Sequence, residues 1–265
     1  MTQISILGCG WLGFPLAKTL LENKFEVKGS TTSEEKLSVL KNEGIAAFKI
    51  ALSEDKIDGN IADFLNVSEI LIIDIPPKLR KQESESFVDK IQNLIPFIEK
   101  SSVKNVIFIS STSVYGEKNT VVSEQTPTNP DTESGKQLVT TEKLLQTNQH
   151  FKTTVVRFGG LIGEDRNPVR SFAGKINIDN PNKPINFIHE QDCIGSILKI
   201  IETKTYNETF NAVAPFHPTR KEYYTQKAVE LNLVPPEFIN DKSSNGKIIL
   251  SDKVEQILKY NFHSI

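Results

Sequence analysis

Cysteine and histidine are scarce in this chain of 265 residues. Two cysteines, Cys9 and Cys193, cannot build a disulfide framework or a cysteine-rich metal site. Four histidines supply too few additional ligands at suitable spacing. We therefore expect no metal site and a reduced, cytoplasmic compartment.

An excess of charge of one sign and long apolar runs are also missing. The formal net charge is −2, and the densest basic stretch, KLRK at 78–81, is typical of a solvated loop. Nucleic acid is therefore not an expected partner. No run approaches the roughly 18 apolar residues of a membrane span, and the N-terminal residues show no charged leader followed by an apolar run. We expect neither a membrane segment nor a secretion signal.

Short apolar runs alternate with stretches of helical apolar spacing up to residue 158. Strands are expected at 3–8, 25–30, 45–50, 69–75, 105–110 and 153–158, and helices at 11–24, 34–44, 83–100 and 132–148. Strands separated by helices at this spacing imply an α/β fold with a Rossmann-type, doubly wound parallel sheet. Thr32 and Glu35 fit a capping box for the helix at 34–44, and Gly44 fits its end.

Gly8, Gly10 and Gly13 form a G-x-G-x-x-G pattern between the first strand and the first helix. The first glycine permits a tight turn, the second lets the backbone approach a pyrophosphate, and the third lets the helix pack close to the strand. Because the motif lies in this strand–turn–helix context, it predicts a dinucleotide site.

The end of the second strand bears on the choice between NAD and NADP. NAD-binding proteins usually place an Asp or Glu there for the ribose 2′-hydroxyl. Residues 28–33 read KGSTTS, which offers hydroxyls and, with Lys36 nearby, a place for a 2′-phosphate, although Glu34 and Glu35 follow. NADP is favoured. The expected cofactor-binding residues are Gly8, Gly10, Trp11, Leu12, Gly13, Ser30, Thr31, Thr32, Asp74 and Pro76.

Prolines become frequent after Gly160 and break the chain into shorter pieces. We expect one helix, at 193–203, and one strand, at 208–214, in this region. The chain is therefore divided into a dinucleotide-binding Rossmann domain at 1–158 and a smaller substrate-binding part at 159–265. No flexible linker separates them, so we expect one compact unit with a cleft between the two.

The segment SSTSVYG, residues 110–116, directly follows the expected strand at 105–110. Together with EQTPTNP, RFGGLIG and INFIHEQDCIGSI further along, it resembles the extended short-chain dehydrogenase/reductases, the NAD-dependent epimerase/dehydratase family, over about residues 4–215. The resemblance implies an oxidoreductase or epimerase that acts on a nucleotide sugar or a similar hydroxyl or carbonyl compound.

The resemblance breaks at the catalytic helix. The family's Ser/Thr falls at Ser111, but its Tyr and Lys fall at Ser134 and Leu138. A serine hydroxyl is a weaker acid than a phenol, and a leucine brings no ammonium to lower a pKa. Lys136 is turned about 200° away on the helix and is expected at the surface. The usual proton relay is therefore absent.

Other residues could take over parts of the site. Tyr115 is the candidate replacement acid, with a packing tyrosine as the alternative. The candidate substrate-binding residues are Arg157, Arg166 and His189. The two arginines are candidates because a guanidinium pairs bidentately with a diphosphate. Arg157 could instead bond carbonyl groups at a strand end. Asp192 is expected to cap the helix at 193–203.

Two functions follow from these patterns. The first is the NAD(P)-dependent enzyme. The second is a non-catalytic NAD(P)-binding sensor or docking protein, whose helix at 132–148 lacks the catalytic tyrosine and lysine. A lysine entering from the C-terminal part would favour the enzyme, whereas a closed pocket beside the nicotinamide would favour the sensor. A small-molecule substrate is the expected partner. The sequence does not decide whether the chain forms a homodimer.

Overall fold

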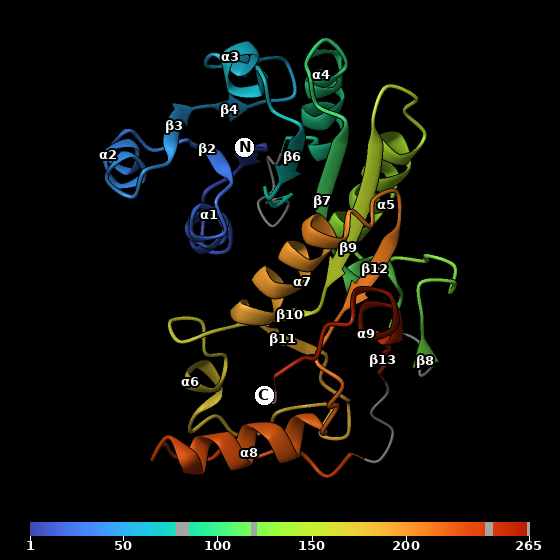
Figure 1. Cartoon of the computed structure of the whole chain (residues 1–265). Coiled ribbons are helices and arrows are strands. Elements are labelled where there is room, and N and C mark those ends of the chain that lie inside the picture. The colour runs from blue at the N-terminus through green and yellow to red at the C-terminus, as the bar shows by residue number, and fades with distance from the viewer. Residues whose placement is uncertain (78–84, 118–120, 242–245, 264–265) are drawn as a thin grey trace.

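The computed structural model describes residues 1–77, 85–117, 121–241 and 246–263. Its centre is a sheet of seven parallel strands (Figure 1). In spatial order they are β12 (Thr209–Ala212), β9 (Lys152–Phe158), β7 (Asn105–Ser111), β6 (Ile70–Ile73), β1 (Gln3–Leu7), β2 (Glu26–Thr31) and β3 (Ala46–Lys49). The chain order reverses between β1 and β6, which confirms the doubly wound Rossmann-type fold.

Helices cover both faces of this sheet (Figure 1). One face carries α1 (Gly13–Glu22), α2 (Glu34–Asn42), α7 (Glu190–Thr203) and α9 (Asp252–Leu258). The other face carries α3 (Ile61–Leu65), α4 (Phe87–Glu99) and α5 (Glu133–Gln146). Successive side chains of a strand point to opposite faces of the sheet, so each strand contributes to both cores. In β1, Ile4 and Ile6 pack in the first core and Leu7 in the second.

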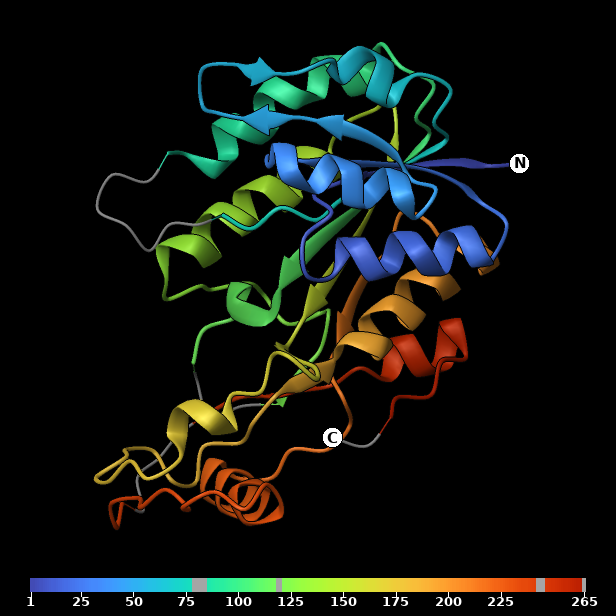
Figure 2. The same cartoon turned by 90° about the vertical axis from the view of Figure 1, so that its left-hand side faces the viewer.

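The smaller C-terminal part lies below the carboxyl ends of the strands, well away from α3 and α4 (Figure 2). It contains α6 (Val169–Phe172), α8 (Arg220–Glu230) and the paired strands β10 (Gly160–Ile162) and β11 (Phe187–His189). Its small core is separate from the other two, with Phe172 stacked on Tyr224 at 4.2 Å between ring centres. Shorter elements are η1 (Thr112–Val114), β8 (Val121–Val122) paired with β13 (Ile248–Ile249), and β4 (Ala51–Leu52) paired with β5 (Ile57–Asp58).

Some expected helix ends are confirmed and others are wrong. Gly44 adopts a positive φ of 80° just after α2, as expected. The capping box at Thr32 does not form, because Ser33 takes the N-cap position and its own N–H donates to the Thr31 hydroxyl. Asp192 does not cap α7, since the His189 side chain does so. The helix expected from residue 83 begins at Phe87, because Ser86 is its N-cap and accepts the Asp89 N–H. Residues 78–84, which include the basic stretch, lie outside the described residues.

Three elements beyond residue 158 lie in the sheet unit. The strand β12 pairs with β9, α7 packs beside α1, and α9 packs on β12 and α7. The helix α8 was not expected, although Thr219 and Glu222 form the capping box that signals its start. Within the described residues, no helix has the length and apolar character needed to cross a bilayer.

Candidate functional site

Two of the three loop glycines are glycine for a steric reason within the protein. Gly8 has a φ of 110°, and a Cβ on it would lie 2.3 Å from the Asp74 carbonyl oxygen. A Cβ on Gly13 would lie 2.1 Å from the Gly8 carbonyl oxygen, so α1 packs directly against the turn. A Cβ on Gly10 would meet no described atom within 4 Å, so Gly10 has open space beside it just before α1.

The side chains of Ser30 and Thr31, at the end of β2, accept hydrogen bonds from backbone N–H groups. The Ser30 hydroxyl accepts the Gly8 N–H at 2.9 Å, and the Ser30 carbonyl accepts the Cys9 N–H at 2.7 Å. Thr32 is exposed. The nearest following carboxylate, Glu34, is paired with Lys49 at 2.6 Å. The end of β2 therefore secures the glycine loop and offers no free carboxylate to a ribose.

Asp74 follows β6 and lies against the glycine loop. Burial raises the pKa of its carboxyl to about 8, although a hydrogen bond from the Gly13 N–H acts to lower it. Near neutral pH the carboxyl therefore holds its proton and adds no negative charge beside the expected phosphates. Pro76, two residues on, is exposed.

The helix α5 carries Ser134 and Leu138 at the places of the family's tyrosine and lysine, and its contacts are those of a packing helix. Leu138, at the family's lysine position, is buried with 4% of its surface exposed. Lys136 is exposed at the surface, as expected, with its side chain 3.9 Å from Glu133. Ser111 is half-buried, and its hydroxyl oxygen accepts the Ser113 N–H at 3.1 Å.

Tyr115 and Arg157 belong to a buried polar network. The Arg157 guanidinium pairs bidentately with Glu142, with NH2 to Oε2 at 2.6 Å, and donates to the Tyr115 hydroxyl at 2.6 Å. The Tyr115 hydroxyl in turn donates to Asn211, and the Ser110 hydroxyl donates to Glu142. Burial raises the pKa of Tyr115, outweighing the effect of the guanidinium.

The contacts of Tyr115 match its structural alternative, a packing tyrosine. Those of Arg157 do not match its alternative, because its partners are a carboxylate and a phenol hydroxyl and not carbonyl groups. Catalysis by Tyr115 and substrate binding by Arg157 stay predictions. No local signal in the sequence pointed to Glu142 as the buried partner of Arg157.

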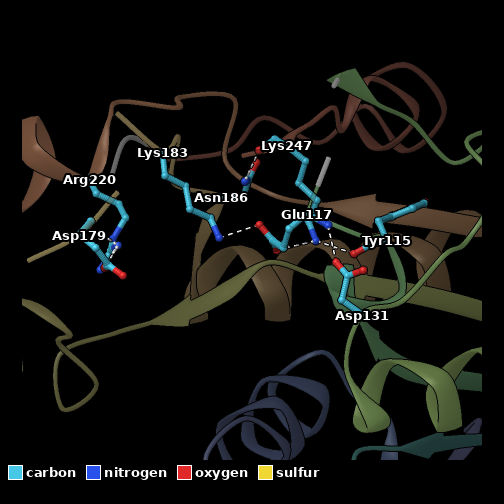
Figure 3. Close-up of polar contacts among 8 residues, drawn as sticks. All are labelled: Tyr115, Glu117, Asp131, Asp179, Lys183, Asn186, Arg220 and Lys247. Atoms are coloured by element: carbon cyan, nitrogen blue, oxygen red, sulfur yellow. Dashed lines mark hydrogen bonds and ion pairs between the residues drawn. The ribbon is translucent and has the colours of Figure 1, made fainter. Parts of the chain in front are cut away.

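A buried lysine does enter from the C-terminal part (Figure 3). The Lys247 side chain is 7% exposed, and its Nζ donates to the Tyr115 carbonyl at 2.7 Å and to Glu117 at 3.0 Å. Glu117 is also paired with Lys183 at 2.6 Å, and the two lysines hold the pKa of Glu117 low against its burial. The Glu117 N–H donates to Asp131. Nothing in the sequence pointed to Lys247, Lys183 or Glu117, because no motif marks the segments that carry them.

Arg166 and His189 lie at the glycine loop, apart from this lysine pair. The Arg166 guanidinium carbon lies 5.0 Å from the centre of the Trp11 ring. The His189 Nδ1 accepts the Gln191 N–H at the start of α7. His189 and Trp11 also line one cavity of about 500 Å³. In the described part of the chain, no three His, Cys, Asp or Glu side chains are grouped to hold a metal ion.

The sequence matches a known family over about two thirds of its length and a curated relative over nearly all of it. The model for the "NAD dependent epimerase/dehydratase family" matches residues 4–178. Protein YeeZ of Escherichia coli K12 is 33% identical over 264 residues, which cover 99% of this chain and 96% of YeeZ.

Solved structures show the same fold. A UDP-glucuronic acid 4-epimerase from Bacillus cereus, in complex with NAD, superposes with a TM-score of 0.84 at 16% identity, covering 100% of this chain and 93% of that one. A UDP-glucose 4-epimerase from Thermotoga maritima, with UDP-glucose, gives 0.81 at 18% identity, covering 100% and 94%. At these identities the likeness concerns the fold.

Proposed function

Because the chain belongs to the NAD-dependent epimerase/dehydratase family, we propose that it is an NAD(P)-dependent epimerase or oxidoreductase acting on a nucleotide sugar or a similar hydroxyl or carbonyl compound. The glycine loop carries this proposal. Gly8 and Gly13 are sterically obligatory, and Gly10 faces open space at a helix start. A bound nicotinamide supplies hydride acceptance and return.

Ser111 is the proposed hydrogen-bond donor to the substrate oxygen. Its oxygen is already oriented by the Ser113 N–H, which leaves its proton free. The second proton group is not Tyr115 in its present contacts, because its hydroxyl is shared between Arg157 and Asn211 and its pKa is raised. Water is therefore the proposed proton acceptor, which implies slower turnover than a tyrosine–lysine pair gives.

NADP is the proposed cofactor in preference to NAD. The support is the lack of a carboxylate in residues 28–33 and the engagement of Glu34 by Lys49. Thr32 and Lys36 are exposed beside the start of α2 and could receive a 2′-phosphate.

The lysine pair supports an anionic substrate. Lys183 and Lys247 come together at Glu117, at 2.6 and 3.0 Å, whereas the Arg220 guanidinium is paired with Asp179. A nucleotide sugar carries a diphosphate that lysine ammonium groups bind. Both epimerases named above are epimerases of UDP-sugars, and the second structure holds UDP-glucose. A homodimer and a cytoplasmic location stay predictions.

The second candidate is a non-catalytic NAD(P) sensor. It is favoured by Leu138, which is packed in the core where the family has its lysine. A sensor needs the glycine loop and no proton relay, and that combination is present.

The single tryptophan allows a direct test, since Trp11 lies within the glycine loop. We expect NADPH and NADH to quench its emission by energy transfer to the dihydronicotinamide, with NADPH binding more tightly. The Trp11→Phe variant removes this signal and serves as its control. The loaded protein is then incubated with UDP-glucose, UDP-glucuronic acid and UDP-N-acetylglucosamine, and sugar epimers or oxidation products are followed by NMR.

Product formation that falls about a hundredfold in Ser111→Ala supports the enzyme. Tight dinucleotide binding without any product supports the sensor. Absence of quenching and of calorimetric binding with all four dinucleotide forms contradicts both functions.

A further inference from the structure

Trp11 packs against a turn from the second half of the chain. Residues 163–166 close this turn through two backbone hydrogen bonds, from the Gly163 N–H to the Arg166 carbonyl and from the Arg166 N–H to the Gly163 carbonyl. The Trp11 indole N–H donates to Asp165 at 2.7 Å. A Cβ on Gly163 would lie 2.9 Å from the indole Cζ2, so the turn and the indole pack in direct contact.

The charges around this turn are mostly negative. The cavity beside Gly10 and Trp11 is lined by the carboxylates of Glu164, Asp165 and Glu190. Burial, and then Asp165, raise the pKa of Glu190, which is the direction expected for crowded carboxyls. A dinucleotide pyrophosphate at Gly10 is itself anionic, so it needs positive charge nearby besides the N-terminus of α1.

Arg166 places a positive charge against Trp11. Its guanidinium stacks over Trp11, the side chain that follows Gly10 in the loop. A guanidinium can pair with two oxygens of a diphosphate at once, which a helix dipole cannot do.

We infer that Arg166 binds the pyrophosphate of the dinucleotide, with residues 163–166 forming a clasp anchored on Trp11. Arg166 is thus a cofactor ligand, whereas the sequence alone suggested a substrate ligand. This inference rests on the dinucleotide binding proposed above and adds the residue that closes the phosphate site from the substrate side.

The test compares arginine variants by calorimetry with NADH and NADPH, because Arg166 contacts the fluorescent reporter. We expect Arg166→Ala to raise the Kd for both by about tenfold or more and Arg166→Lys to raise it less. Arg170→Ala is the matched control, since Arg170 is an exposed arginine four residues later, in α6, and should leave the Kd unchanged. Glu164→Gln should tighten binding, because it removes one repelling charge.

Other outcomes separate the inference from its premise. A folded Arg166→Ala protein with the wild-type Kd for both dinucleotides, checked by circular dichroism, overturns the clasp and leaves the proposed function standing. An increase confined to the KM of the sugar substrate returns Arg166 to the substrate site. A wild-type protein that binds no dinucleotide overturns the proposed function, and the clasp with it.

Discussion

At the scale of single residues, the glycine loop separates two kinds of requirement. Gly13 is glycine because backbone from the preceding turn occupies the place of a side chain. Gly10 has open space beside it in the protein itself, so on the proposed function a bound dinucleotide, and not the fold, requires glycine there. On that proposal, two positions in one motif serve folding and binding separately.

Alanine variants should divide along the same line. We expect Gly13→Ala to lower the free energy of unfolding by about 2 kcal/mol or more, because a contact at 2.1 Å forces the helix and the turn apart. Gly10→Ala should change stability by less than about 0.5 kcal/mol yet weaken NADPH binding about tenfold. Urea denaturation and calorimetry on both variants check this. Equal destabilisation by the two changes would contradict it.

At the scale of elements, one buried network joins α5, β7, β9 and β12. Glu142 of α5 is bonded to Ser110 of β7 and Arg157 of β9, and the latter reaches Asn211 of β12 through Tyr115. The helix that has lost its catalytic pair is thus fixed to the sheet by a charge pair. Such a pair gives little net stability by itself, but each charge depends on the other.

Removing one charge of this network should be costly. We expect Arg157→Met to destabilise the protein by about 3–5 kcal/mol, because Glu142 is then buried without its cation. The double variant Arg157→Met with Glu142→Met should recover most of the loss. Urea unfolding of the two single variants and the double variant measures the coupling. A double variant no more stable than Arg157→Met alone would show that the pair is not the cause.

At the scale of the whole molecule, the segment around Lys247 binds the smaller C-terminal part to the Rossmann unit. Asn186 accepts the Ile249 N–H and donates to the Lys247 carbonyl, while Lys247 reaches across to Tyr115 and Glu117. The strand β13 also pairs with β8. Chain segments far apart in sequence thus meet beside Tyr115 and Glu117 (Figure 3).

The two lysines on Glu117 should differ in their effect on stability. We expect Lys247→Met to cost about 2 kcal/mol, because its loss leaves the buried Tyr115 carbonyl without its donor, although Glu117 keeps its pair with Lys183. Lys183→Met should cost less than about 1 kcal/mol, since the Lys183 side chain is 33% exposed and its ion pair is screened by water. Lys136→Met, at a surface lysine, is the control. Thermal and urea unfolding measure all three, and a larger loss for Lys183→Met than for Lys247→Met would reverse this assignment.

The fold and the turn of the glycine loop could be predicted because their signals are local. Apolar periodicity specified the seven main strands and the helices α1, α2, α4, α5 and α7, but not α8, and the spacing of Gly8, Gly10 and Gly13 specified the turn. The expected caps at Thr32 and Asp192 were wrong because several nearby polar residues compete for the same helix N-terminus. Ser33 and His189 took those places.

By itself, the sequence determined the doubly wound sheet, the dinucleotide loop and the absence of the tyrosine–lysine pair, since each depends on residues close together in the chain. Only the tertiary structure decided that Tyr115 shares its hydroxyl with Arg157, that Arg166 lies on Trp11, and that Lys247 is buried beside Glu117. Those contacts join residues 42, 155 and 130 positions apart. Their partners are set by how the layers pack, and no local pattern carries that information.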